Sequence, residues 1–123
     1  MSDPEVVLVT EADELYRRLH WTAVRDGEVL SVAYKRSGKP ASTFSVDIAR
    51  LTTPETSVGL GPAGSGVGIL VAGVPMGLGF SVTHSPEMGN DAHANVTGDN
   101  TKQKCRLLAE ATNIHIEPDA PEQ

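Results

Sequence analysis

Few side chains in this sequence of 123 residues could bind a metal or activate a substrate. There is one cysteine, and the four histidines are His20, His84, His93 and His115. A zinc site takes several Cys or His ligands at short fixed spacings, and neither a second cysteine nor a His-x-x-x-His pair is present. Asp91 and His93 would share one face of a strand, but this pair alone does not hold a metal. We therefore predict no metal and no cofactor.

Cys105 is a candidate nucleophile by residue type. It falls on the inner face of a helix predicted over residues 102–112. A reactive thiolate needs a partly exposed, electropositive site, whereas a buried thiol behaves as a small hydrophobe. We expect Cys105 to be buried. Because no serine occupies a G-x-S-x-G elbow, catalytic residues stay unassigned.

A glycine-rich segment spans residues 59–79, which hold eight of the twelve glycines. It starts with Gly-Leu-Gly-Pro-Ala-Gly, which matches the letters G-x-G-x-x-G. In dinucleotide-binding proteins this pattern follows a strand and opens a helix whose N-terminus receives the pyrophosphate. Here a predicted helix precedes the pattern, a β-like run follows it, and Pro62 lacks an N–H donor. The pattern favours a connection between a helix and a strand, and a functional role of the segment stays open.

Five residues are candidates for a binding surface by their chemistry: Arg17, His20, Trp21, Ser31 and His93. Trp21 is the only tryptophan in the chain. An exposed tryptophan marks an interface hot spot, whereas a buried one belongs to the core. Since the chain has few aromatic residues, burial is the simpler expectation for Trp21.

Two basic clusters, one in a predicted loop and one on the predicted C-terminal helix, comprise Lys35, Arg36, Lys39, Lys102, Lys104 and Arg106. If folding brings them together, they could hold phosphate or an acidic partner; two separate solvated faces are the simpler interpretation. The net charge of the chain is -6, with acidic residues concentrated at both ends. Because nucleic-acid binding depends on clustered cations, this distribution disfavours nucleic acid as a partner.

Apolar periodicity predicts the elements that would position these side chains. Thr10 and Asp13 resemble a capping box, and helical apolar spacing follows, which predicts a helix ending near His20. Thr53 and Pro54 open a short helix that Gly59 ends. Strands are predicted over residues 29–34, 43–48, 67–74, 78–82, 92–97 and 114–116, and the first two could close a hairpin.

We expect an α+β fold with a mostly antiparallel sheet of about four to five strands and two main helices packed against it. Residues 1–9 form an N-terminal segment, 10–116 a single domain and 117–123 an acidic flexible tail. The longest apolar stretch is too short and too rich in glycine for a membrane-spanning helix. Because the N-terminus lacks a secretory signal, we expect a cytoplasmic protein without membrane contact.

Four segments resemble, in this order, a group of small uncharacterised bacterial proteins. The segments are LYRRLH (15–20), DGEVLSVAY (26–34), FSVD (44–47) and AHANVTG (92–98). The pattern of the group is L-Y-R-x-x-H, D-G-x-V-x-S-x-A-F, L-S-V-D and A-H-A-x-V-x-G. This chain departs from the group with Trp21 in place of proline and Tyr34 in place of phenylalanine. The resemblance implies a bacterial source and one compact unit, and it transfers no catalytic residue.

These observations lead to three hypotheses about function. The first is a non-enzymatic module that binds a protein partner, because no complete catalytic set is visible. The second is an NAD- or nucleotide-using enzyme similar to ADP-ribosyltransferases, built on Arg17, Ser31 and Ser45 with Glu110 as a candidate acid. It requires Arg17, Ser31 and His93 to converge in one pocket around the glycine-rich segment. The third is nucleic-acid binding through the basic clusters, with affinity that falls steeply with salt.

Overall fold

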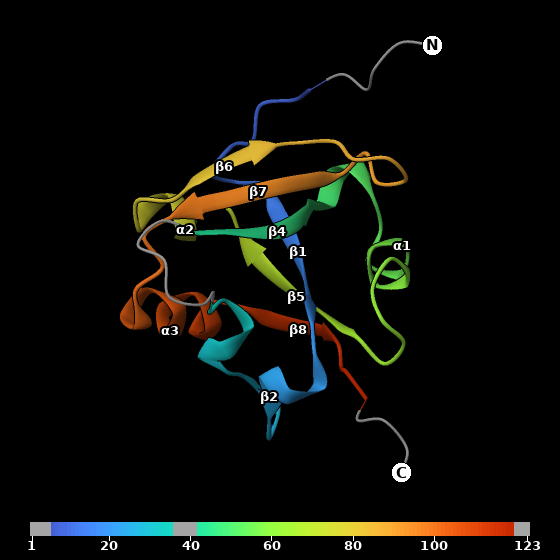
Figure 1. Cartoon of the computed structure of the whole chain (residues 1–123), viewed down its shortest axis with the longest axis vertical. Helices are drawn as coiled ribbons and strands as arrows, with labels where there is room; N and C mark the ends of the chain where they lie inside the picture. Colours follow the sequence, from blue (N-terminus) through green and yellow to red (C-terminus); the bar gives the residue numbers. More distant parts are fainter. Residues whose placement is uncertain (1–5, 36–41, 120–123) are drawn as a thin grey trace.

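The computed structural model describes residues 6–35 and 42–119 of the chain. In this part, a six-stranded antiparallel sheet has the order β6-β7-β4-β1-β5-β8 (Figure 1). Its strands are β1 (Glu14–Leu19), β4 (Ser42–Ile48), β5 (Gly66–Val71), β6 (Ser81–His84), β7 (His93–Gly98) and β8 (Asn113–Ile116). The predicted α+β class is confirmed, but the sheet is larger than the predicted four to five strands.

Short helices and a small ribbon complete the described fold. The helices are η1 (Trp21–Ala23), η2 (Ser31–Ala33), η3 (Ala49–Leu51), α1 (Pro54–Gly59), α2 (Gly73–Gly77) and α3 (Lys102–Glu110), and the ribbon pairs β2 (Val24–Arg25) with β3 (Glu28–Val29). Of the α-helices in this part of the chain, only α3 exceeds seven residues, so the prediction of two main helices was wrong. None of the helices described is both long and apolar enough to cross a membrane.

One face of the sheet carries the hydrophobic core. As predicted, Phe44, Val46 and Ile48 alternate onto the same face of β4, and all three are buried. The Phe44 ring contacts the ring of Tyr34, with centroids 5.0 Å apart in the edge-to-face arrangement that aromatic pairs prefer. Helices η2 and α3, which lie together in Figure 1, cover this face. Cys105 is buried there, as predicted.

The opposite face of the sheet contains a buried carboxylate. Asp47 is only 1% exposed and is paired with Arg18, whose Nη1 atom lies 3.0 Å from Asp47 Oδ2. The hydroxyl of Ser57 in α1 donates to Oδ2 at 2.6 Å, and the amide of Asn90 donates to Oδ1 at 2.7 Å. Asp47 therefore joins β4 to β1, to α1 and to the loop before β7.

The prediction of a helix that ends near His20 is wrong, because most of these residues form β1. Its start signal produces a single turn: Thr10 N donates to Asp13 Oδ2 at 2.8 Å, and Asp13 N donates to Thr10 O at 3.1 Å. A hydrogen bond from Arg50 also holds the pKa of Asp13 below its ordinary value. From Glu14 onward the chain pairs with both β4 and β5. These two ladders satisfy the backbone in place of helical bonds.

The strand predicted over residues 29–34 is also wrong. Only Glu28 and Val29 of this region form a strand, and η2 follows after Leu30. The predicted hairpin between this segment and β4 does not form, since β4 pairs with β1 and β7. The segment turns into η2 instead and packs beneath α3, which buries Ala33 and Tyr34.

The remaining predictions differ mainly in their boundaries. The predicted strand 67–74 ends at Val71, because Gly73 and Val74 belong to α2. The strand predicted over residues 78–82 corresponds to β6, which covers Ser81–His84 instead. The helix that begins after Thr53 is confirmed, because the Thr53 side chain accepts from Thr56 N. The predicted elements corresponding to β4, β7, α3 and β8 are confirmed.

Tyr34 makes a buried hydroxyl chain that should make stability sensitive to alkaline pH. The Thr112 hydroxyl donates to Leu108 O at 2.7 Å, so the Tyr34 hydroxyl donates to Thr112 Oγ1, also at 2.7 Å. Burial of the ring raises the pKa of Tyr34 from 10.0 to about 12. Between these two values the unfolded chain ionises Tyr34 and the folded chain does not.

We therefore expect the free energy of unfolding to fall as pH rises above 10.0 toward 12, by on the order of 2 kcal/mol from Tyr34 alone. Tyr34→Phe should cost about 1 kcal/mol at neutral pH and should show a smaller alkaline loss. Urea unfolding at several pH values measures both, with the wild type, which has the same lysines, as the reference. Equal alkaline losses in Tyr34→Phe and in the wild type would contradict this role of Tyr34.

Candidate functional site

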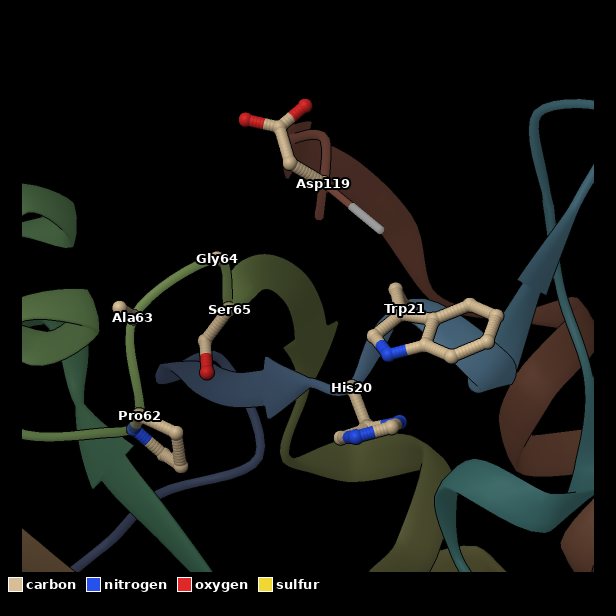
Figure 2. A pocket seen from close by; sticks show the side chains of 7 residues that line it. All are labelled: His20, Trp21, Pro62, Ala63, Gly64, Ser65 and Asp119. Atoms are coloured by element: carbon tan, nitrogen blue, oxygen red, sulfur yellow. The ribbon is translucent and has the colours of Figure 1, made fainter. Parts of the chain in front are cut away.

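A hollow opens at the end of the sheet where β1 stops and β5 starts. Leu19 pairs with Gly66 in the antiparallel ladder, so residues that follow β1 lie beside residues that precede β5. Figure 2 shows this hollow, which has a volume of about 180 Å³. We call it the Trp21 hollow; it is lined by His20, Trp21, Pro62, Ala63, Gly64, Ser65 and Asp119.

Two of the predicted binding residues, His20 and Trp21, form one side of the Trp21 hollow. Trp21 is 41% exposed, so the expectation that it belongs to the core is wrong. Its ring lies beside the His20 ring, with centroids 5.6 Å apart. His20 caps η1, because Thr22 N donates to His20 Nδ1 at 3.2 Å. Nδ1 is therefore the acceptor nitrogen, and the cap holds the His20 ring in place.

The loop before β5 and Asp119 form the other side of the Trp21 hollow. Gly64 has a φ of +85°, which strongly favours glycine, and the loop turns through a bond from Ser65 N to Pro62 O. Asp119 N donates to Gly64 O at 2.8 Å, which fastens the residues after β8 to this loop. The G-x-G-x-x-G letters mark this loop in the sequence, whereas Asp119 is not among the predicted site residues and has no local sequence signal.

The chemistry of the Trp21 hollow suits a single cationic side chain. An indole face attracts a guanidinium or ammonium group. Asp119 also lines the hollow, and its carboxylate points outward from the rim (Figure 2), so it adds a negative charge near the entrance. Both groups are exposed, so a partner can reach them. The volume is below that of a typical small-molecule site, which favours one inserted side chain over a whole cofactor.

Arg17, a third predicted binding residue, is used inside the fold. Its guanidinium donates to Ala33 O at 2.8 Å and to Ser45 O at 2.8 Å. It also lies over the rings of Phe44 and Tyr34, at 5.3 Å and 5.7 Å from their centroids. Arg17 therefore ties η2 to the core face of the sheet.

His93 is buried on the opposite face, where it pairs with Ser45. His93 Nδ1 donates to Ser85 O at 2.8 Å, and Nε2 lies 3.1 Å from Ser45 Oγ and 3.5 Å from Glu87 Oε1. A serine beside an oriented histidine is the arrangement of an activated nucleophile. Here, however, Ser45 lies within β4, which is paired on both sides. His93 is only 5% exposed, so the pair serves to join β4, β7 and the residue 85 loop.

Ser31 lies in a different place, next to part of the basic patch. It lines a groove of about 540 Å³ together with Lys102, Gln103 and Arg106. Lys104 is directed elsewhere and lies over the Phe80 ring at 5.6 Å. Of the loop cluster, Lys35 is described and exposed, whereas Arg36 and Lys39 lie outside the described residues.

The structure does not bring Arg17, Ser31 and His93 into one pocket. Arg17 and His93 lie on opposite faces of the sheet, and Ser31 belongs to the groove at α3. Glu110, the candidate acid of an ADP-ribosyltransferase-like site, lines yet another hollow, beside Glu28. Within the described ranges, no three His, Cys, Asp or Glu side chains gather as metal ligands. Burial also raises the pKa of Cys105, which opposes thiolate formation.

Comparisons with protein-family models, with curated proteins and with solved structures find no match to this chain. The resemblance to small bacterial proteins therefore stays a prediction.

Proposed function

We propose that this protein is a non-enzymatic, cytoplasmic bacterial module that binds a partner protein through the Trp21 hollow. The observation that carries the proposal is that Trp21 is 41% exposed at the rim of the Trp21 hollow. The volume of this hollow, about 180 Å³, suits a single side chain. Tryptophan is enriched among the residues that contribute most to protein interfaces.

The occupant we propose is an arginine or lysine side chain of the partner. The indole face and the Asp119 carboxylate both favour a cation. The net charge of the whole chain, -6, would also attract a basic partner surface. A basic partner is therefore a better fit than an acidic one.

The placement of the other candidates supports binding over catalysis. Arg17 and His93 are hydrogen-bonded to the fold itself. Nucleic-acid binding is less well supported, because three of the ten basic residues, Arg17, Arg18 and Arg50, have carbonyl or carboxylate partners within the structure. They cannot contribute to a continuous cationic surface.

The test is the dependence of a purified complex on Trp21. A tagged chain would be expressed in the organism that carries the gene, cross-linked, and its co-purifying proteins identified and then purified for titration. We expect Trp21→Ala to weaken the complex by about 30-fold, the effect of losing a hot spot of about 2 kcal/mol. Because the chain has a single tryptophan, its fluorescence reports binding to the wild type directly.

The matched control is Met88→Ala, which truncates a fully exposed apolar side chain in another loop. We expect its affinity to equal that of the wild type. Asp119→Lys should also weaken the complex, because it places a like charge against the proposed cation. If every candidate partner binds the Trp21→Ala chain as tightly as the wild type, the proposal is wrong.

A further inference from the structure

A second surface of the molecule has the opposite charge and lies between η2 and α3. We call it the Ser31 groove; its lining residues are Ser31, Lys102, Gln103 and Arg106, and its volume is about 540 Å³. Lys102 and Arg106 are one helical turn apart on α3, so both side chains face the same way. The groove exists because α3 packs on η2.

The cations of the Ser31 groove are unpaired within the described residues. Arg18 and Arg50 each have a carboxylate partner there, whereas neither Lys102 nor Arg106 has one. No carboxylate lines the groove, and the first turn of α3 contains no acidic residue. In an acidic chain, this is a local concentration of positive charge.

All four lining residues carry hydrogen-bond donors. Lysine and arginine supply charged N–H groups, glutamine an amide and serine a hydroxyl. This set matches the oxygens of a phosphate group, to which arginine donates in pairs. The volume is within the range of small-molecule sites. The lining side chains are polar or charged, which is a poor fit for an apolar peptide segment.

We propose that the Ser31 groove binds the phosphate group of a small phosphorylated molecule, with Lys102 and Arg106 as the charged contacts. This site is separate from the Trp21 hollow and does not depend on protein binding there. The remainder of the ligand would lie along the groove, next to Ser31 and Gln103.

The test uses the ¹⁵N-labelled full chain titrated at low salt with inorganic phosphate, adenosine monophosphate and adenosine. We expect saturable shifts of the Ser31 and Gln103 amide signals with both phosphates and none with adenosine. Tighter binding of the monophosphate would identify an organic phosphate as the source, and equal affinity would identify free phosphate. Both results support the phosphate site.

Two variants of α3 distinguish a specific phosphate site from general electrostatic attraction between the ligand and the positive charges of the helix. Arg106→Gln should weaken phosphate binding by about tenfold, as expected for a charge-assisted contact. Lys104→Gln removes the same charge, but its side chain lies over Phe80, so it should bind as the wild type does. Equal weakening in both variants, or no saturable shift in the folded wild type, would overturn the proposal. So would tighter, Arg106-dependent binding of a random DNA duplex, which would indicate a nucleic-acid surface instead.

Discussion

Replacing Asp47 with alanine is expected to lower the free energy of unfolding by about 3–5 kcal/mol, the usual cost of removing one partner of a buried ion pair. The side chain is 1% exposed and accepts from Arg18, Ser57 and Asn90. Without it, the Ser57 hydroxyl loses its acceptor in a fully buried position. The total stability of a domain is about 5–15 kcal/mol, so this loss threatens the fold. Urea unfolding of the purified variant measures it.

The control for the Asp47 prediction is Asp91→Ala, which removes the same charge from an exposed side chain close to β7. We expect a change within about 0.5 kcal/mol for Asp91→Ala. Ser57→Ala should lie between the two, at about 1 kcal/mol, because it removes one hydrogen bond and keeps the ion pair. Similar losses in the Asp47 and Asp91 variants would show that the Asp47 network does not stabilise the fold.

Gly66→Ala is expected to destabilise the protein by about 3 kcal/mol, the upper end of the usual cost of overpacking. A β-carbon at this position would lie 2.3 Å from Ile116 O and 2.6 Å from Pro118 N. These are backbone atoms, so they cannot rotate away, and β8 would have to move. The same shift would displace Asp119, which bonds to Gly64 at the Trp21 hollow. We therefore expect weaker partner binding as well, measured with the titration used for Trp21→Ala.

Gly59→Ala is the matched control from the same glycine-rich segment. A β-carbon there meets nothing within 4 Å, and Gly59 is the last residue of α1. Alanine should be neutral or stabilising by up to about 1 kcal/mol, because it restricts the unfolded chain. If both glycine variants unfolded at the same urea concentration, close packing against β8 would not explain the glycine at position 66.

The letters G-x-G-x-x-G at residues 59–64 thus have a physical explanation other than nucleotide binding. Gly64 has a positive φ, a backbone conformation in which alanine would be strained. Gly66, just after the loop, lies against the backbone at the end of β8 and just beyond it. The order helix, loop, strand around this segment was predictable from the Thr53 cap and the apolar run after Gly66. The close approach of β8 and Asp119 was not, because it depends on a strand far along the chain.

Local signals in the sequence determined the elements whose residue pattern fits only one type of secondary structure. Alternation in Phe44, Val46 and Ile48 specified β4, and the cap at Thr53 specified α1. Leu15 and Leu19 fit both helical and strand spacing, so their own residues could not decide between the two. The tertiary structure decided for β1, because β4 and β5 supply hydrogen bonds on both of its sides. It also decided that Trp21 is exposed, since the turn after β1 carries the ring past the edge of the core, and that Asp119 lines the same hollow.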